Sequence, residues 1–435
     1  MDNNENSSNF NKTSHKPIIV GAICACAGVV LGALGFFGIT KLMGQNTPGC
    51  TEKCDCPKCL IGEDVSKNLA ASFLKLEASD KNIIYSPLSI NYGLSLLRAG
   101  ADGETKSEID KVLGDVELSK YSNIEDKLSL ANAVFIKESW SDTVLPSYIN
   151  TVEQDFNAEV IYDKLQDSAP IKKWVANKTF DLIKDFDISI NPDTRMVLAN
   201  ALAIQLDWQH KFDTEDTGGK NFYKSDGSEI IATTMNLSTS ADDVKYYIDD
   251  DVTLLSLPLE SVGDAALDFV AVMPSGELSN YINTLDLDVV MGNLGAAKPA
   301  STPKDGVEIS IPKYKFEYSL NFVNDLKSLG INSAFDGELA DFSRMSTLDN
   351  LYVSDAIHKA NIDFSEEGIK AAAITVFVMN DITAIGPTPQ EKVTIRIDKP
   401  FLFLIRDRNN DTIWFIGSVY EPNLWENDAN DYTSW

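Results

Sequence analysis

The sequence predicts one large α+β domain preceded by a membrane-spanning helix. From about Asp64 onward, segments with apolar residues at helical spacing alternate with segments rich in β-branched residues. The helical segments gather in the first half of this region and the strand segments in the second, with no Gly/Ser-rich or Pro-rich break between them. An uncharged, mostly apolar stretch occupies residues 17–40 and predicts the membrane helix.

The amino-acid composition excludes some classes of function. The chain has 435 residues, of which 44% are hydrophobic, which is ample for a large packed core. Its 65 acidic residues outnumber its 37 basic residues, giving a formal charge of −28. Nucleic-acid binding requires clustered Lys and Arg side chains, and the sequence has no basic stripe. We therefore expect no nucleic-acid partner and a highly solvated surface.

Residues 1–16 are expected to form a polar tail and residues 17–40 an uncleaved signal anchor. The apolar run is long enough to cross a hydrocarbon core of ~30 Å as a helix. A cleaved signal peptide is the alternative, although its apolar core is usually only ~7–15 residues long. Lys12 and Lys16 precede the span and Lys41 follows it, so the orientation stays open. Gly28 and Gly32 have the spacing that permits helix-mediated self-association.

Residues 41–63 are predicted to be a stalk containing Cys50, Cys54, Cys56 and Cys59. Disulfides within the stalk or between neighbouring chains are the favoured interpretation if the domain is extracytoplasmic. A metal site and free or acylated thiols are the alternatives, since the cysteine spacing matches no standard zinc pattern. No cysteine follows Cys59, and the chain has only three histidines, His15, His210 and His358. We expect no cofactor, no resident metal and no catalytic residue in the domain.

Within the domain, residues 69–78 and 88–100 carry apolar residues at helical spacing, and Ser89 is placed to help begin the second helix. Several of the predicted strands are apolar on both faces, which indicates a sheet covered on both sides. The predicted strands are 128–136, 196–208, 267–274, 307–317, 393–407 and 412–420.

A series of short motifs, in order along the domain, resembles the serpin family. The motifs lie at residues 82–90 (NIIYSPLSI), 100–105 (GADGET), Asn132, 174–179 (WVANKT), 200–212 with Asn200, Trp208 and Phe212, 311–314 (IPKY), 329–343, 358–360 (HKA) and 399–403 (KPFLF). Gln205 and Leu206 depart from the family's usual Lys-Gly.

The resemblance covers roughly 360 residues and implies a serpin domain at 64–424, followed by an acidic tail at 425–435. It implies three β-sheets, about nine helices, an exposed reactive-centre loop and no enzyme activity. His358, Asn200, Trp208 and Ser86 would then have packing and hydrogen-bonding roles.

The resemblance also implies a mechanism for residues 366–383. A serine-type or cysteine-type endopeptidase would cleave the loop, and the loop would then insert into the main sheet as an extra strand while still bound to the enzyme as an acyl ester. The expected hinge residues are Glu366, Glu367, Gly368, Ile369, Lys370, Ala371, Ala372 and Ala373. The family's hinge-to-bait spacing places the reactive bond between Ile382 and Thr383, with Met379, Asp381 and Ile385 as neighbouring candidates.

The loop residues suit insertion. Side chains alternate along a strand, so insertion would bury Ile369, Ala371, Ala373, Thr375, Phe377 and Met379, none of which is charged. Ile369 and Lys370 depart from the Thr or Ser and the Glu usual in inhibitory members.

The expected partner is a serine protease with an apolar pocket (elastase-, chymotrypsin- or subtilisin-like), met outside the cell at the membrane. The alternative is a non-inhibitory protein of the same fold with a binding, chaperone-like or adhesive role. A hydrolase acting through His210 or His358 is the third hypothesis.

Overall fold

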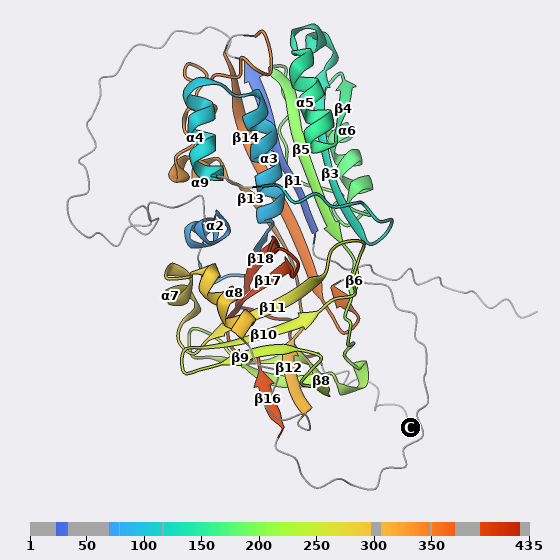
Figure 1. The fold of residues 1–435 in the computed structure, drawn as a ribbon, viewed down its shortest axis with the longest axis vertical. Helices are drawn as coiled ribbons and strands as arrows, with labels where there is room; N and C mark the ends of the chain where they lie inside the picture. Colours follow the sequence, from blue (N-terminus) through green and yellow to red (C-terminus); the bar gives the residue numbers. More distant parts are fainter. Residues whose placement is uncertain are drawn as a thin grey trace, which may run out of the picture.

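The structure is a computed structural model that describes residues 23–33, 69–77, 79–114, 117–296, 306–348, 350–369 and 392–426. The molecule is elongated, with one six-stranded sheet along its upper half and two further sheets below (Figure 1). The predicted α+β class with three main sheets is confirmed. The tail at 1–16, the stalk at 41–63 and residues 427–435 lie outside the described residues.

The upper sheet has the strand order β13-β14-β1-β5-β3-β4. Its strands are β13 (Tyr314–Asn321), β14 (Leu351–Phe364), β1 (Ile23–Ala33), β5 (Thr194–Ile204), β3 (Leu128–Lys137) and β4 (Ala158–Asp163). All neighbouring pairs are antiparallel except β3 and β4, which are parallel.

Two sheets form the lower half. The first has the order β2-β18-β17-β11-β10-β9 and the second β16-β12-β8-β7, and a two-stranded sheet joins β15 to β6. Their strands are β2 (Ile83–Tyr85), β18 (Ile413–Val419), β17 (Phe401–Asp407), β11 (Leu267–Pro274), β10 (Val252–Pro258), β9 (Lys245–Ile248), β16 (Val393–Arg396), β12 (Gly306–Pro312), β8 (Glu229–Ser240), β7 (Gly218–Tyr223), β15 (Gly368–Ile369) and β6 (Leu206–Asp207).

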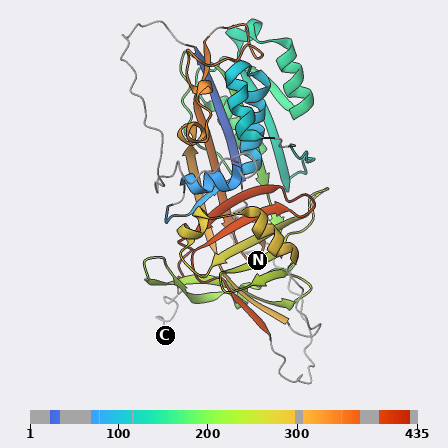
Figure 2. The ribbon, with the colours of Figure 1, turned by 60° about the vertical axis from the view of Figure 1, so that its left-hand side comes forward.

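Most of the helices lie beside the upper sheet, and others lie next to the six-stranded lower sheet (Figure 2). The α-helices are α2 (Leu69–Glu77), α3 (Pro87–Gly100), α4 (Gly103–Leu113), α5 (Pro146–Phe156), α6 (Ala169–Lys178), α7 (Leu278–Asn283), α8 (Leu287–Ala296) and α9 (Val323–Leu329), and the 3-10 helices are η2 (Glu138–Thr143), η3 (Thr214–Asp216) and η4 (Ser333–Phe335).

The upper sheet is covered on both faces, as the two-sided apolar strands predicted. Ala199, Ala201 and Ala203 of β5 pack with α6 on one face. Met196 and Leu198 of the same strand pack on the opposite face, in the large core that includes α3. A residue added to this sheet therefore meets a buried environment whichever face it points to.

Three predicted strands are each divided in the structure. The expected strand 196–208 is divided at Gln205 into β5 and β6, which belong to different sheets. The expected strand 307–317 ends at Pro312, and β13 begins at Tyr314 in a different sheet. The expected strand 393–407 is interrupted before Pro400, whose nitrogen cannot donate to a ladder. The N-cap of α3 is Ser86, whose side chain accepts a hydrogen bond from the Ser89 backbone, so Ser89 is not the capping residue.

The largest departure from expectation lies at the N-terminus. Residues 23–33 were expected within a helix, but they form the extended strand β1 between β14 and β5. Small and β-branched residues pair readily as a strand when a sheet offers a ladder on both sides. None of the helices in the described part of the chain is long and apolar enough to cross a membrane. The rest of 17–40 lies outside the described residues.

Candidate functional site

The candidate site begins where the chain leaves β14 and turns back toward the sheet. Residues 365–369, which we call the hinge segment, form a tight turn followed by β15. Gly368 pairs with Asp207 and Ile369 with Leu206, antiparallel to β6 at the end of β5. Gly368 and Ile369 thus run antiparallel to β6, the strand that follows β5 in the chain.

Gly368 is required by this geometry. Its φ of 151° lies in a region that L side chains rarely adopt, and a Cβ placed there would lie 2.2 Å from the Leu206 carbonyl oxygen. The glycine therefore allows the hinge segment to approach β6 closely enough to pair. Ile369, which follows it, is fully buried in the lower core.

Glu366 is a buried carboxylate at the same turn. Its Oε2 lies 2.7 Å from the Lys313 ammonium, and its Oε1 accepts a hydrogen bond of 2.8 Å from the Thr217 hydroxyl. Burial acts to raise the pKa of Glu366, but these hydrogen bonds outweigh burial and hold the pKa below its ordinary value. The carboxylate is therefore kept ionised, and it fixes the hinge to the residues that immediately precede β7 and β13.

Trp208 anchors the hinge segment through two hydrogen bonds to its backbone carbonyls. Its indole nitrogen donates to the Ser365 carbonyl at 2.8 Å, and its backbone nitrogen donates to the Glu367 carbonyl at 3.0 Å. The Trp208 ring packs against Phe364 with centroids 5.2 Å apart. Glu367 also pairs with Lys211 at 2.9 Å. The hinge segment is thus anchored by charge, backbone hydrogen bonds and aromatic packing together.

A buried polar cluster lies further up the same sheet from the hinge segment, next to the start of α3. The His358 Nε2 accepts from the Ser86 backbone at 3.2 Å, and Ser89 donates to Asn200. Asn200 in turn donates to the Asn132 side chain at 2.8 Å. Burial lowers the pKa of His358 to about 3, so the imidazole is neutral. These contacts give His358, Asn200 and Ser86 the structural roles expected of them.

Strand β1 passes this polar cluster. We call the place between β5 and β14 the central position of the sheet, and β1 occupies it over most of the length of both neighbours. Its pairing with β14 shifts between Ala25 and Gly28, and its pairing with β5 shifts between Ala25 and Val29. These irregularities fall opposite His358 and Asn200, so β1 is an imperfect partner at this point.

The structure places some of the predicted site residues and leaves others out. Glu366 to Ile369 lie together at the end of β5. Lys370, Ala371, Ala372, Ala373, Ile382 and Thr383 lie outside the described residues. The sequence analysis did not identify Lys313, Thr217 or Lys211 as hinge partners. Lys313 stands in the IPKY motif, which was the available signal for a placed cation.

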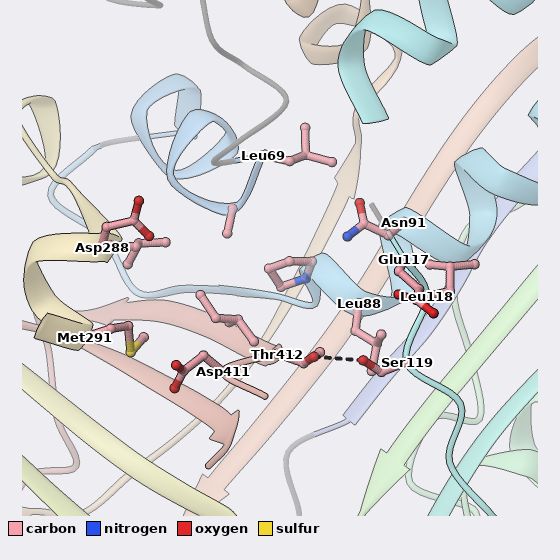
Figure 3. Close-up of a pocket in the computed structure, with 14 residues that line it drawn as sticks. Leu69, Leu88, Asn91, Glu117, Leu118, Ser119, Asp288, Met291, Asp411 and Thr412 are labelled. Atoms are coloured by element: carbon pink, nitrogen blue, oxygen red, sulfur yellow. Dashed lines mark hydrogen bonds between the residues drawn. The ribbon is translucent and has the colours of Figure 1, made fainter. Parts of the chain in front are cut away.

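A separate cavity of about 330 Å³ opens between α2, α8 and the β17–β18 turn (Figure 3). Its walls combine apolar side chains, among them Leu69, Leu88 and Met291, with the carboxylates Glu117, Asp288 and Asp411. Ser119 and Thr412 are joined by a hydrogen bond of 2.9 Å at one side. The cavity shares no residue with the hinge segment. Within the described ranges, no cluster of His, Cys, Asp or Glu could hold a metal ion.

Comparisons with known proteins agree with this geometry. The family model described as "Serpin (serine protease inhibitor)" matches residues 63–422. Human alpha-1-antichymotrypsin is similar at 29% identity, over 80% of this chain and 84% of that protein. The native crystal structure of the thermophilic serpin tengpin aligns with a TM-score of 0.69 at 27% identity, over 85% of this chain and 96% of that one.

The fold is also found in a protein with a different role. Human thyroxine-binding globulin aligns with a TM-score of 0.67, over 83% of this chain and 97% of that chain. At 23% identity, this likeness shows the fold alone.

Proposed function

Because the chain belongs to the serpin family, most of whose members inhibit proteases, we propose that it traps serine-type endopeptidases as a suicide substrate. The protease serine attacks the carbonyl of Ile382, the bond to Thr383 breaks, and the Thr383 amine takes a proton and leaves. The remaining ester joins the enzyme to the loop, and insertion of 368–382 into the sheet carries the enzyme away before water can hydrolyse it. Cysteine proteases would form a thioester by the same route.

The observation that carries this proposal is that the sheet accepts a strand between β5 and β14. Strand β1 is paired on both sides there. The hinge segment enters at the end of the same edge, where Ile369 pairs with Leu206. A loop continuing from Ile369 would extend the β15–β6 pairing along β5. The fold therefore offers both the entry point and a ladder for the inserted strand.

The loop composition matches a sheet covered on both faces. If the pairing continues without a bulge, Ala371 and Ala373 would lie opposite Ile204 and Leu202, toward the lower core. Ala372, Ile374 and Val376 would lie on the face that α6 covers, and none of residues 371–379 is charged. Uncharged residues on both faces are what this environment requires, because an unpaired buried charge is costly.

Ile369 and Lys370 are expected to affect loop insertion differently. Ile369 is already buried and paired, so its branched side chain has a place in the packed hinge. Lys370 would lie opposite Gln205, which is itself buried. Insertion of Lys370 is therefore expected to be the slowest step. Slow insertion lets a protease complete hydrolysis and leave the loop merely cleaved.

The target protease is proposed from the residue before the reactive bond. Ile382 suits an enzyme with an apolar pocket of the elastase, chymotrypsin or subtilisin kind. The name of the similar human protein, alpha-1-antichymotrypsin, is consistent with this class. Residues 17–40 are proposed to tether the inhibitor to the membrane, with the domain on the extracytoplasmic side.

The test reconstitutes the full chain in phosphatidylcholine vesicles and mixes it with chymotrypsin, elastase and subtilisin. We expect an SDS-resistant complex with at least one of them, and a released fragment that begins at Thr383. Ala373→Arg places a charge in the inserted strand and should convert the inhibitor into a substrate. Thr388→Arg, beyond the reactive bond, is the matched control and should still give complex. Cleavage by every protease without any complex would reject inhibition.

A second candidate function rests on the cavity beside α8. Its apolar side chains and the carboxylates Glu117 and Asp288 suit a small organic cation with an apolar body, while Asp411 is paired with Arg406 at 2.7 Å. The cavity volume is at the lower end for ligand sites. If the chain binds such a cation and forms an SDS-resistant complex with none of the proteases, the non-inhibitory function is favoured. Thermal-shift screening with amphipathic amines, with Asp288→Asn as the comparison variant, distinguishes specific binding from general charge attraction.

A further inference from the structure

We propose that residues 23–33 act as an internal gate, a strand that occupies the central position of the sheet and competes with the reactive loop for it. This inference rests on the proposed function, because it describes how the same insertion would be controlled. The occupant is a segment of the chain itself, and its partners are the facing edges of β5 and β14.

The first argument is register. Along β5, strand β1 pairs from Ile23 opposite Ala203 to Gly32 opposite Thr194. The hinge segment pairs Ile369 with Leu206, also antiparallel. If this pairing continued, each residue after Ile369 would lie opposite the residue one position before Leu206, then two positions before it, and so on along β5. Ala372 would then reach Ala203, and Asp381 would reach Thr194, if the register continues unbroken.

The gate strand and the loop therefore require the same hydrogen-bonding groups in the same direction. On the β14 side, β1 pairs from Asn361 to Leu351, nearly the whole of that strand. A loop entering from Ile369 could order only about two residues before it met β1. With the gate strand in place, a cleaved loop has no ladder on either side, and trapping cannot proceed.

The second argument is that the two segments are chemically alike. Residues 23–33 (ICACAGVVLGA) and residues 371–380 (AAAITVFVMN) are both uncharged and composed mainly of small, β-branched and other apolar residues. Because the sheet is covered on both faces, it selects for this composition and not for a particular side chain. Either segment satisfies that demand.

The third argument concerns reversibility. The pairing of β1 shifts twice along its length, once opposite the polar cluster of His358 and Asn200 and once near its end. Each shift disrupts ladder hydrogen bonds. The loop can follow the β15–β6 register from its first residue, so we expect it to displace β1 once β1 begins to leave.

The register gives a direct test in the full chain. Cys24 pairs with Ala360 of β14, and opposite residues of antiparallel strands have Cα atoms about 4.5–5.5 Å apart, within the range of a disulfide. Ala360→Cys is made in a chain whose other five cysteines are changed to Ser, leaving Cys24. Mild oxidation should join residues 24 and 360, detected by gel mobility and by mass spectrometry of the linked peptides.

The control for crosslinking is Ala356→Cys in the same background, because Val29 and not a cysteine lies opposite Ala356. Equal crosslinking in the two variants would overturn the placement of β1. A second variant, Val29→Asp with Val30→Asp, should expel the gate strand by placing charges in the sheet. Gln45→Asp with Asn46→Asp adds the same charge outside β1 and should leave the gate strand in place.

Two readouts separate this inference from the proposed function. Thermal unfolding after loop cleavage reports insertion even if no protease is trapped. We expect a rise in Tm for the Val29→Asp/Val30→Asp variant, and no rise for the crosslinked chain until dithiothreitol is added. A rise in the crosslinked chain would overturn the gate. Absence of SDS-resistant complex in every variant, with the Tm pattern intact, would reject inhibition and leave the gate standing.

Discussion

At the scale of single residues, the buried polar groups of the upper sheet define where charge is tolerated. His358 is fully enclosed, accepts a hydrogen bond from the Ser86 backbone and packs near Phe322, with ring centroids 6.3 Å apart. Glu366, by contrast, is buried as a carboxylate because Lys313 and Thr217 hold it. Strand β14 thus holds a neutral group, and the turn that follows it holds a charged one, each set by its immediate neighbours.

The neutral state of His358 predicts a pH dependence of stability. Its pKa is lowered from 6.5 to about 3 in the folded protein, so the unfolded chain binds the proton more readily. The contribution of His358 to the free energy of unfolding is therefore fully present above pH 6.5. It falls as the pH decreases toward 3, by up to about 1.4 kcal/mol per pH unit. Urea midpoints of the wild type and His358→Gln should converge as the pH falls.

The control for this experiment is His210→Gln, which changes a partly exposed histidine paired with Asp243. Its effect on the urea midpoint should vary much less with pH between 7.5 and 5. A wild-type slope that persists unchanged in His358→Gln would contradict the assignment.

At the scale of elements, the two-residue strand β15 determines how the loop approaches the sheet. Its pairing with β6 depends on the left-handed backbone of Gly368 and on contact too close for any side chain. The aromatic and ionic contacts of Trp208 and Lys211 then fix the turn before it. A short element can therefore set the register of a much longer inserted strand.

Gly368→Ala should detach β15 from β6. The positive φ costs about 1–3 kcal/mol for a residue with a Cβ, and the clash with the Leu206 carbonyl adds to that cost. We expect faster hydrogen exchange in the peptide 204–209, which contains the Trp208 amide bonded to Glu367.

Gly227→Ala is the matched control, because Gly227 also has a positive φ but no atom lies within 4 Å of its added Cβ. It should share the backbone strain and leave exchange at 204–209 unchanged. Equal exchange in the two variants would show that the close approach to β6 is not what holds the hinge.

At the scale of the whole molecule, the N-terminal segment has two mutually exclusive destinations. Residues 23–33 are paired in the sheet, and the same residues belong to the predicted membrane span at 17–40. A residue cannot lie in both places. Insertion of the span into a bilayer would therefore vacate the central position and make it available to the loop.

Phosphatidylcholine vesicles should accordingly reduce the crosslink between Cys24 and Cys at position 360 in the Ala360→Cys chain. Ile18→Lys with Ile19→Lys is the matched control, because it charges the predicted span outside β1 and opposes membrane insertion. That variant should keep its crosslink when vesicles are added. Undiminished crosslinking in the parent chain bound to vesicles would show that the two destinations do not compete.

Much of the fold could be predicted from local sequence. Helices α2 and α3 and strands β3 and β11 lie within one residue of their predicted bounds, because their periodicity, turn residues and apolar runs act over short distances. The two-sided apolar strands also predicted correctly that the upper sheet is covered on both faces. The breaks at Gln205, at Lys313 and before Pro400 were missed, since they depend on which sheet each half joins.

By itself, the sequence determined the α+β class, the family and the presence of two uncharged apolar segments able to become a strand. Only the tertiary structure decided that Ile23–Ala33 lies between β5 and β14, and that Glu366 is held by Lys313, 53 residues away in the chain. The physical reason is that strand pairing and buried ion pairs join distant parts of the chain. Local composition shows that a segment can pair, and the sheet edges available to it determine where it does.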